Sequence, residues 1–331
     1  MLHNVLNVDL STLVDAGTSL VPADPFTTAV AYAQLGVDRS AELPLSLEAT
    51  LGREGAFGLL HAEHPGPRGI VTARPDISVS DHFGVDAWKI DHMMYADDDQ
   101  RAPGLTALLS AATIEFRKRC VSLVSARVRS DDLAAMWAFQ KAGFNVMDTM
   151  VTHSIRPKNS HQPMPLSRQI GDLTLLAHTP ELLPEVEQSV VDEFADLLYR
   201  YYTTSRFHAD RRLDPHLASS FYSNWCREAF AGRWSDGVLG AYLGSTPVGF
   251  VAGKFDELAI QASGIRIYGS GLAASQGHGG YGAMVSTIAD NVACDLAEFT
   301  AHVSNLPVQA AIAKHGSPRT LWANHALHLW L

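Results

Sequence analysis

Basic residues and cysteines are both scarce in this sequence. Its 25 Lys and Arg residues are outnumbered by 35 Asp and Glu residues, which gives a net charge of −10 with histidine neutral. A nucleic-acid partner held through phosphate contacts would need the opposite balance, so that class of partner is excluded. The three cysteines, Cys120, Cys226 and Cys294, are too few and too scattered for a disulfide framework or a thiolate zinc site, and we expect no metal.

Long apolar runs are missing as well. The chain has no stretch of about 18 apolar residues, and its first residues are not a basic segment followed by an apolar core. We therefore expect no membrane partner and a cytoplasmic location. The 331 residues, 47% of them hydrophobic and 18% charged, are typical of a folded chain of about two domains at ~150 residues each.

A proline-rich segment lies near the middle of the chain. Residues 157–165 are polar and contain three prolines, which cannot continue a helix or a central strand. We interpret residues 157–168 as a linker between a first domain over 1–156 and a second domain over 169–331.

The two halves end in the same order of elements. Apolar spacing and turn residues predict a helix, a strand, a helix and a strand, over 105–116, 120–129, 132–142 and 145–155 in the first half and over 284–296, 299–304, 307–315 and 321–330 in the second. Asp131 is the expected N-cap of the 132–142 helix. Asp132 precedes Gly143 by eleven residues, as Asn305 precedes Gly316, so the halves resemble a duplication offset by 173 residues. Both are predicted to be α/β domains.

A glycine-rich loop precedes the helix that starts near Met284. Gly277, Gly279 and Gly282 fit the pattern G-x-G-x-x-G, and amides at a helix N-terminus bind phosphate oxygens. The dinucleotide fingerprint of this form normally opens a βαβ unit with further strands. Only about 50 residues remain here, and Glu298 stands at the beginning of the next strand rather than its end. We therefore favour the acyl-CoA loop of acyltransferases. The corresponding segment of the first half, 101–104, has a single glycine.

With these residues the chain resembles the GNAT acetyltransferase superfamily. It is most similar to the TDP-fucosamine acetyltransferase group, which pairs a degenerate N-terminal GNAT domain with an active C-terminal one. The segments that carry the resemblance are 80–84, 131–144, 205–210, 222–225, 276–282, 305–316 and 328–331. The fold it implies is two tandem GNAT-like domains, each a mixed central sheet flanked by helices.

The resemblance also implies a site. Acetyl-CoA or another acyl-CoA would lie in a V-shaped opening between two splayed parallel strands, 265–273 and 299–304, with its pyrophosphate on the amides of 277–282. The co-substrate residues implied are Leu272, Ala273, Gln276, Gly277, His278, Gly279, Gly280, Tyr281, Gly282 and Asn305. The acceptor would be a small-molecule amine, in that group a nucleotide-linked amino sugar, which attacks directly in a ternary complex. The acceptor-binding residues implied are Ser205, Arg206, Phe207 and His208.

One departure from the family concerns the proton donor. GNAT enzymes often carry a tyrosine seven residues after the asparagine, and this position is Ile312. Histidine suits proton transfer near neutral pH, so His315 and His302 are candidates for the role, together with Tyr268. Ile312 also keeps two alternatives open: a non-catalytic acyl-CoA-binding or interaction protein, and a GNAT protein with another acyl donor or acceptor. The sequence leaves open whether the chain forms a homodimer.

Overall fold

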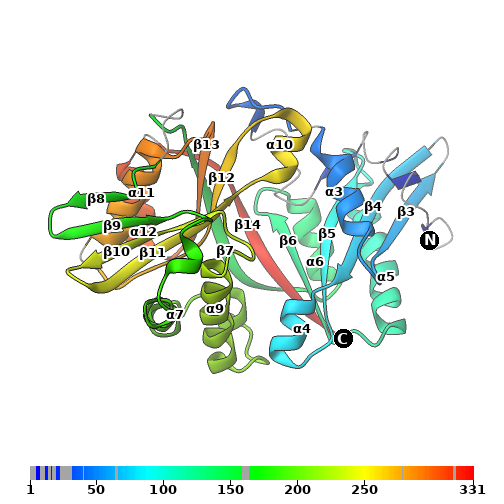
Figure 1. Ribbon diagram of the computed structural model, residues 1–331. Coiled ribbons are helices and arrows are strands. Elements are labelled where there is room, and N and C mark those ends of the chain that lie inside the picture. Colours follow the sequence, from blue (N-terminus) through cyan, green and yellow to red (C-terminus); the bar gives the residue numbers. More distant parts are fainter. Residues whose placement is uncertain are drawn as a thin grey trace. The chain divides into compact units, whose positions relative to one another are not determined.

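The fold is described from a computed structural model. The structure describes residues 5–7, 12–13, 16, 20–22, 32–39, 41–63, 66–158, 164–277, 279–315 and 318–331. The chain divides into two compact units: unit 1 comprises Met1–Thr149 and Trp322–Leu331, and unit 2 comprises Met150–Leu321. Figure 1 shows the elements along the chain.

Unit 1 is built on a mixed sheet. Its strands run in the order β1-β3-β4-β5-β6-β14, with β2 beside β5 and the first residues of β7 beside β14. β5 and β6 are parallel, and the pairs β1–β3, β3–β4, β4–β5, β2–β5 and β6–β14 are antiparallel. The elements are β1 (Val5–Asn7), β2 (Val21–Pro22), α3 (Glu42–Leu51), β3 (Phe57–Glu63), β4 (Gly66–Pro75), α4 (Ile77–Phe83), β5 (Ala87–Tyr95), α5 (Arg101–Lys118), β6 (Leu123–Arg129), α6 (Leu133–Lys141) and β7 (Asn145–Ile155).

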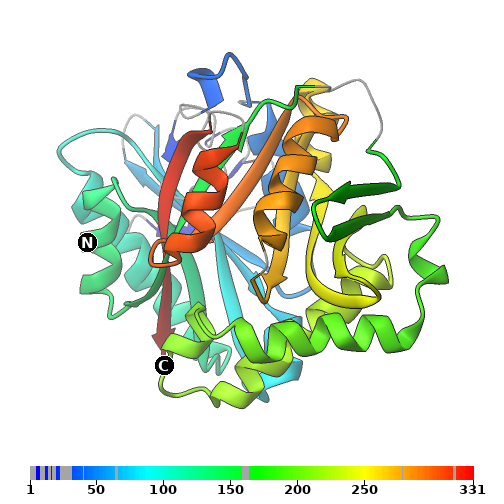
Figure 2. The same cartoon turned by 90° about the vertical axis from the view of Figure 1, so that its left-hand side faces the viewer.

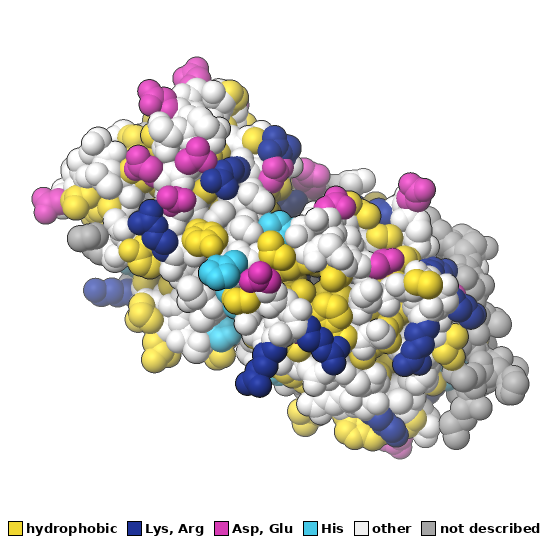
Figure 3. Space-filling view, turned by 90° about the horizontal axis from the view of Figure 1, so that it is seen from below, with side chains coloured by type: hydrophobic (Ala, Val, Ile, Leu, Met, Phe, Trp, Pro, Cys, Tyr) yellow, Lys and Arg dark blue, Asp and Glu magenta, His cyan; other side chains and the backbone are white. Residues whose placement is uncertain are grey.

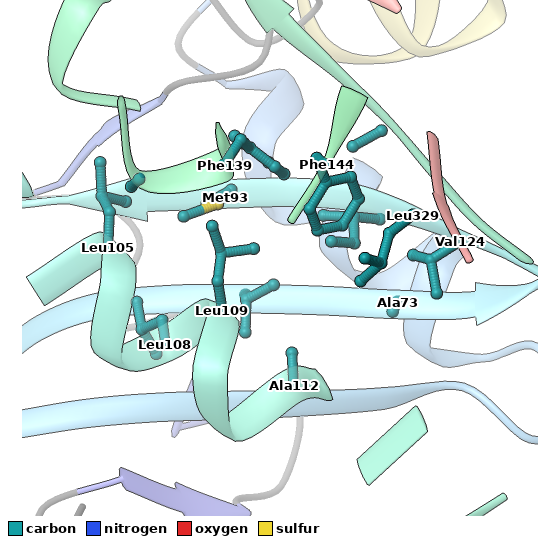
Figure 4. Packing of buried hydrophobic residues seen from close by; sticks show 14 of the residues in the cluster. Ala73, Met93, Leu105, Leu108, Leu109, Ala112, Val124, Phe139, Phe144 and Leu329 are labelled. Carbon is teal, nitrogen blue, oxygen red and sulfur yellow. The ribbon is translucent and has the colours of Figure 1, made fainter. Parts of the chain in front are cut away.

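The core of unit 1 lies between this sheet and helices α5 and α6. The apolar stripe that predicted α5 is buried along its length: Leu105, Leu108, Leu109, Ala112 and Phe116 are at most 1% exposed. They belong to one cluster with residues of β5, β6, α6 and β14 (Figure 4). The helical spacing of these residues therefore forms the contact face, as expected.

Unit 2 has the same kind of sheet. Its strands run from the second part of β7 in the order β7-β13-β12-β11-β10-β9-β8, with β12 and β13 parallel and the other pairs antiparallel. Its further elements are β8 (Ser167–Ile170), β9 (Leu173–His178), the 3-10 turn η1 (Leu183–Glu185), α7 (Gln188–Tyr201), α8 (Arg206–Ala209), α9 (Pro215–Phe230), β10 (Gly237–Leu243), β11 (Thr246–Phe255), α10 (Glu257–Ser263), β12 (Ile267–Ser275), α11 (Gly280–Asn291), β13 (Leu296–His302) and α12 (Leu306–Lys314), and β14 (Arg319–Trp330) follows.

Helices cover both faces of this second sheet. Phe250 of β11 packs against Phe194 of α7, and Phe194 stacks on Phe230 of α9 at 5.3 Å. The next residue, Val251, points to the opposite face and belongs to the cluster that α11 and α12 bury. Figure 2 shows α11 (orange) and α12 (red-orange) side by side.

The parallel strands β12 and β13 are paired over part of their length. Their register joins Ile267–Ser270 to Leu296–Phe299 and ends there. At this point β12 has a bulge, since the β11 register passes from Ser270 to Leu272 and skips Gly271. A bulge bends its strand and increases the local twist. The rest of β12 pairs with β11 and the rest of β13 with β7, so unit 2 contains the splayed pair of parallel strands that we expected.

Each unit contains a strand that comes from the other half of the sequence. The residues Met150–Ile155 of β7 pair with β13 inside unit 2, and the residues Asn324–Trp330 of β14 pair with β6 inside unit 1. The units therefore differ from the predicted domains 1–156 and 169–331, because each sheet takes a strand from the other half of the chain.

Several element boundaries also differ from the expected ones. The N-cap of α6 is Asp132, not Asp131: its carboxylate accepts from the Ala135 N–H at 3.0 Å. Helix α12 ends at Lys314, so His315 lies outside the helix with an extended backbone. Gly316, which the spacing from Asn305 matched to Gly143, falls outside the described residues.

One face of the surface carries charges of both signs. On the face seen in Figure 3, basic side chains (dark blue) and acidic ones (magenta) are interspersed. Among the described residues, no helix has both the length and the apolar character needed to cross a bilayer.

Candidate active site

The glycine-rich turn between β12 and α11 contains two residues with positive φ. Gly277 has φ 110°, and Gly279, the N-cap of α11, has φ 72°. These values favour glycine, because other residues are strained there. The turn is fixed by the Gly280 N–H, which donates to the Gly277 carbonyl at 3.1 Å, and by the Gln276 N–H, which donates to a β11 carbonyl at 3.0 Å. The sequence motif therefore forms a defined turn.

The N-terminus of α11 has no side-chain cap. Gly279 has no side chain that could accept hydrogen bonds from the first amides, and the first turn has no acidic residue. These amides carry partial positive charge and can bind an anion such as a phosphate. Gly280 allows close packing, since a Cβ there would lie 3.1 Å from the Ser275 Oγ. The half-buried Tyr281 packs against the core of unit 2, and burial raises its pKa. His278 lies outside the described residues.

The free edge of β12 lies beside this turn. The pairing of β12 with β13 ends at Ser270, so the backbone of the residues from Leu272 onward faces the opening between the strands. The Leu272 side chain is buried at 3% exposure, and Ala273 is half-buried. Backbone amides along such an edge can donate to a carbonyl oxygen, which gives the opening an oxyanion-binding capacity.

Tyr268 lies at the closed end of the strand pair, opposite Ala297. It is 6% exposed, and its ring packs so tightly on Gly253 that a Cβ there would be 2.6 Å from the hydroxyl. Burial raises the pKa of the Tyr268 hydroxyl, which keeps it protonated inside the core. This geometry separates Tyr268 from the opening, and it argues against a role in proton transfer.

His302 lies at the open end of the strand pair, as the last residue of β13. Its Nδ1 accepts from the Ser304 N–H at 3.2 Å and lies 2.7 Å from the Ser304 hydroxyl. An accepting Nδ1 leaves the proton of the neutral ring on Nε2. Nε2 has no hydrogen-bond partner in the described part of the chain, so it is available as a donor.

The other predicted residues of this region lie around α12. Ile312 is fully buried in the core of unit 2. His315 follows the helix, and its Nε2 is 3.7 Å from the position that a Cβ on Gly282 would take. Burial, followed by the charge of Lys314, lowers the pKa of His315, which disfavours its protonated form. Asn305 is the N-cap of α12, because its Oδ1 accepts from the Val308 N–H at 3.3 Å.

The predicted acceptor segment forms the short helix α8. The buried Ser205 caps it, and its Oγ is 2.8 Å from Nδ1 of His208, whose Nε2 is 3.1 Å from the Ser219 Oγ. The His208 ring also stacks on Tyr222 at 6.1 Å, and burial lowers its pKa. Phe207 is 2% exposed, whereas Arg206 is half-buried with its guanidinium 4.7 Å from the Phe207 ring. The two ring nitrogens of His208 thus have partners in Ser205, which caps α8, and in Ser219 of α9, so His208 fixes α8 on α9.

Two tryptophans beside the β12 bulge were not predicted as site residues. A Cβ on Gly271 would be 2.8 Å from the Trp234 ring, which packs on Trp225 of α9 at 4.9 Å. Both indoles are half-buried. The available signal was the glycine at the bulge, but a bulge becomes visible only when the strand register is known.

The corresponding opening of unit 1 is filled by side chains. Strands β5 and β6 pair in parallel over only three residues each, so they also diverge. The Tyr95 ring covers Gly104 in the first turn of α5, and its hydroxyl oxygen lies 2.9 Å from Nδ1 of His61. The buried Arg101 donates to the Tyr95 carbonyl at 2.9 Å and to the Asp132 carboxylate at 2.5 Å. Tyr95 and Arg101 thus occupy the place that the glycine turn leaves accessible in unit 2.

Comparisons with known proteins show which solved structures have a similar fold. No family model and no curated protein matches the sequence. Among solved structures, the chain is similar to a GCN5-related N-acetyltransferase from Sphaerobacter thermophilus, with a TM-score of 0.58 and 13% identity over 98% of this chain and 95% of that one. It is also similar to a tandem GNAT protein from the clavulanic acid biosynthesis pathway, with a TM-score of 0.50 and 12% identity over 98% of both chains. The chain therefore has the tandem GNAT fold, with α/β units and mixed sheets as expected.

Proposed function

We propose that unit 2 transfers an acyl group, with acetyl as the first choice, from an acyl-CoA to the amino group of a small molecule. The observation that carries the proposal is the opening between β12 and β13 beside the uncapped glycine N-terminus of α11. An extended thioester arm fits between diverging strands, and its pyrophosphate fits amides that no side chain caps. Unit 1 lacks this combination in its described residues, because Tyr95 and Arg101 fill its opening.

The acyl-CoA supplies a thioester whose carbonyl carbon the neutral amine attacks. A C–N bond forms, the C–S bond breaks, and the amine proton passes to solvent. Backbone N–H groups on the free edge of β12 donate to the carbonyl oxygen as negative charge develops on it. We assign to His302 a hydrogen bond from Nε2–H to the departing sulfur. A thiolate leaves without a strong acid, since its parent thiol has a pKa near 8.5, which is compatible with Ile312 in the place of a tyrosine.

For the acceptor, we propose an amine bound near α8, with a nucleotide-linked amino sugar as the first class to test. Arg206 offers a guanidinium that pairs well with phosphate. It has no ion pair in the described part of the chain. The two half-buried indoles of Trp225 and Trp234 add apolar surface beside the β12 bulge.

A matched pair of glycine variants tests the acyl-CoA site. Gly279→Glu places a carboxylate at the N-terminus of α11, and Gly264→Glu places one at the end of α10. Both glycines have φ near 73°, and a Cβ meets nothing within 4 Å at either position. Backbone strain is therefore similar, and the difference reports the local charge. We expect calorimetry to show acetyl-CoA binding for the wild type and Gly264→Glu, with affinity reduced on the order of tenfold or more for Gly279→Glu.

The same calorimetry is repeated with NAD, and CoA release is measured in a separate turnover assay. Binding of NAD in place of acetyl-CoA, or equal losses in both variants, would contradict the assignment. CoA release with an amine acceptor should fall roughly 100-fold in His302→Ala with acetyl-CoA affinity unchanged. The buried Ile312 favours one second candidate, a protein that binds acyl-CoA without transferring the acyl group. Tight binding with no turnover over a broad panel of amines would select that candidate.

A further inference from the structure

The Trp234 ring covers the point where β12 separates from β13. The pairing of the two strands ends at Ser270, and Gly271 is the bulge residue that follows. A Cβ on Gly271 would lie 2.8 Å and 3.2 Å from two atoms of the Trp234 ring, so the indole rests directly on the backbone of the bulge. Only glycine permits so close an approach of a ring to the backbone. The narrow end of the opening is therefore bounded on one side by an indole.

The Trp234 ring is fixed to α9 by several contacts. Its Nε1–H donates to the Trp225 carbonyl at 2.9 Å, and the two indoles pack at 4.9 Å. Both sequence neighbours of Trp234 are bound to carbonyls of α9 as well, the Arg233 N–H at 3.0 Å and the buried Ser235 hydroxyl at 2.8 Å. The ring can turn away from the bulge only if these contacts are lost, and the bonds cost free energy to break. Trp234 is thus a rigid boundary.

The two helices that flank the opening lie on opposite faces of the sheet. The glycine-rich turn begins α11, which covers one face, whereas Trp225 belongs to α9 on the other face. A donor whose pyrophosphate binds the α11 amides would enter the opening from the α11 face. Its thioester would lie between the diverging strands, and its acyl group would point toward the α9 face. The acyl group would then meet Trp234 beside the bulge.

Unit 1 has the same bulge but a different residue in it. The register between β4 and β5 skips Asp91, as the register between β11 and β12 skips Gly271. The Asp91 carboxylate accepts from Nε of Arg74 at 2.6 Å and pairs with Nζ of Lys89 at 2.8 Å. An ion-paired side chain thus occupies the bulge of the unit whose opening is filled. The bare backbone beneath an indole is found in the unit whose opening is accessible.

We propose that Trp234 limits the length of the acyl group and restricts the donor to acetyl-CoA. The two carbons of an acetyl group end beside the ring, whereas each further methylene must displace an indole that is fixed to α9. One methylene that does not fit a rigid apolar site changes binding by about 10–200-fold. The inference rests on the function proposed for unit 2 and deepens it, since it selects one donor among the acyl-CoAs.

Calorimetry on the full-length protein tests the proposal without an acceptor. The ligands are CoA, acetyl-CoA and butanoyl-CoA, so that CoA reports the pyrophosphate site and the ratio of the two thioester affinities reports the acyl end. Trp234→Ala removes the boundary, and Trp234→Phe keeps a smaller ring without the N–H. Trp137→Ala removes a 48% exposed indole of unit 1 and serves as the matched control.

We expect the wild type and Trp137→Ala to bind butanoyl-CoA about tenfold or more weakly than acetyl-CoA. In Trp234→Ala the two affinities should agree within about threefold, with CoA affinity unchanged, and Trp234→Phe should be intermediate. Equal binding of both thioesters by the wild type, or unchanged discrimination in Trp234→Ala, would overturn the proposal and leave the acyl-CoA site of unit 2 intact.

Two further outcomes of this experiment are distinguishable from these. Loss of CoA binding in both Trp234 variants would also overturn the proposal, because the ring would then support the acyl-CoA site and not bound the acyl group. Failure of the wild type to bind CoA and both thioesters would refute the function proposed for unit 2, and this inference with it.

Discussion

Tyr95 and Gly104 of unit 1 should be strongly coupled in stability. A Cβ on Gly104 would lie 2.0 Å from Cζ of the Tyr95 ring, and this ring is 1% exposed. Overpacking a core reduces the free energy of unfolding by about 1–3 kcal/mol, and we expect so close an overlap to cost about 3 kcal/mol. Alanine is favoured over glycine in a helix by about 1 kcal/mol, so Gly104→Ala should cost about 2 kcal/mol. In a Tyr95→Ala background the overlap is gone, and the same change should stabilise by about 1 kcal/mol, a coupling of about 3 kcal/mol.

The assay is urea unfolding of the wild type, both single variants and the double variant. Tyr95→Ala alone should cost about 3–5 kcal/mol, as loss of a buried aromatic ring does. Gly66→Ala serves as the control glycine of unit 1, because a Cβ there meets nothing within 4 Å, and it should show no coupling to Tyr95. If Gly104→Ala and Tyr95→Ala were additive within about 0.5 kcal/mol, the ring would not cover Gly104 and the filled opening of unit 1 would be refuted.

Two further predictions concern ionisable groups. Burial raises the pKa of Cys294 to about 12 and raises that of Cys226 as well, whereas Cys120 is exposed. We expect one thiol per chain to react with a disulfide reagent at pH 8 in the native protein and three after unfolding; any thiol that still reacts fast in Cys120→Ser would disprove this burial. Burial lowers the pKa of His178, so the unfolded chain takes up its proton first and stability falls as the pH drops below about 6.5. His178→Gln should reduce the loss of urea stability between pH 7.5 and 5.5, and an unchanged loss would contradict the assignment.

Much of the local structure followed from the sequence. The spacing of Leu105, Leu109 and Phe116 predicted the buried face of α5, and the glycines before Met284 predicted the turn that starts α11. These signals are local, since a helix face or a positive φ is written in a few neighbouring residues. The N-cap of α6 differed by one residue because Asp131 and Asp132 are both good caps and only the geometry selects between them.

The site could be predicted only in part, because its remaining features depend on distant contacts. His315 was expected on the face of a helix, but the backbone becomes extended at that residue. Tyr268 was expected near the chemistry, but the register places it at the paired end of β12. The Tyr95 ring fills the opening of unit 1 because it packs against two glycines from other elements, Gly69 and Gly104.

The exchanged strands have a consequence for how the chain is made. The first half of a protein emerges from the ribosome before the second half, and domains generally fold in that order. Here the sheet of unit 1 lacks its β14 strand until residues Trp322–Leu331 have been synthesised. Unit 2 needs Met150–Ile155 from ahead of the proline-rich segment. A stop codon just before Trp322 would therefore damage the unit encoded first, and a gene cut at the proline-rich segment would yield two fragments that each lack a strand.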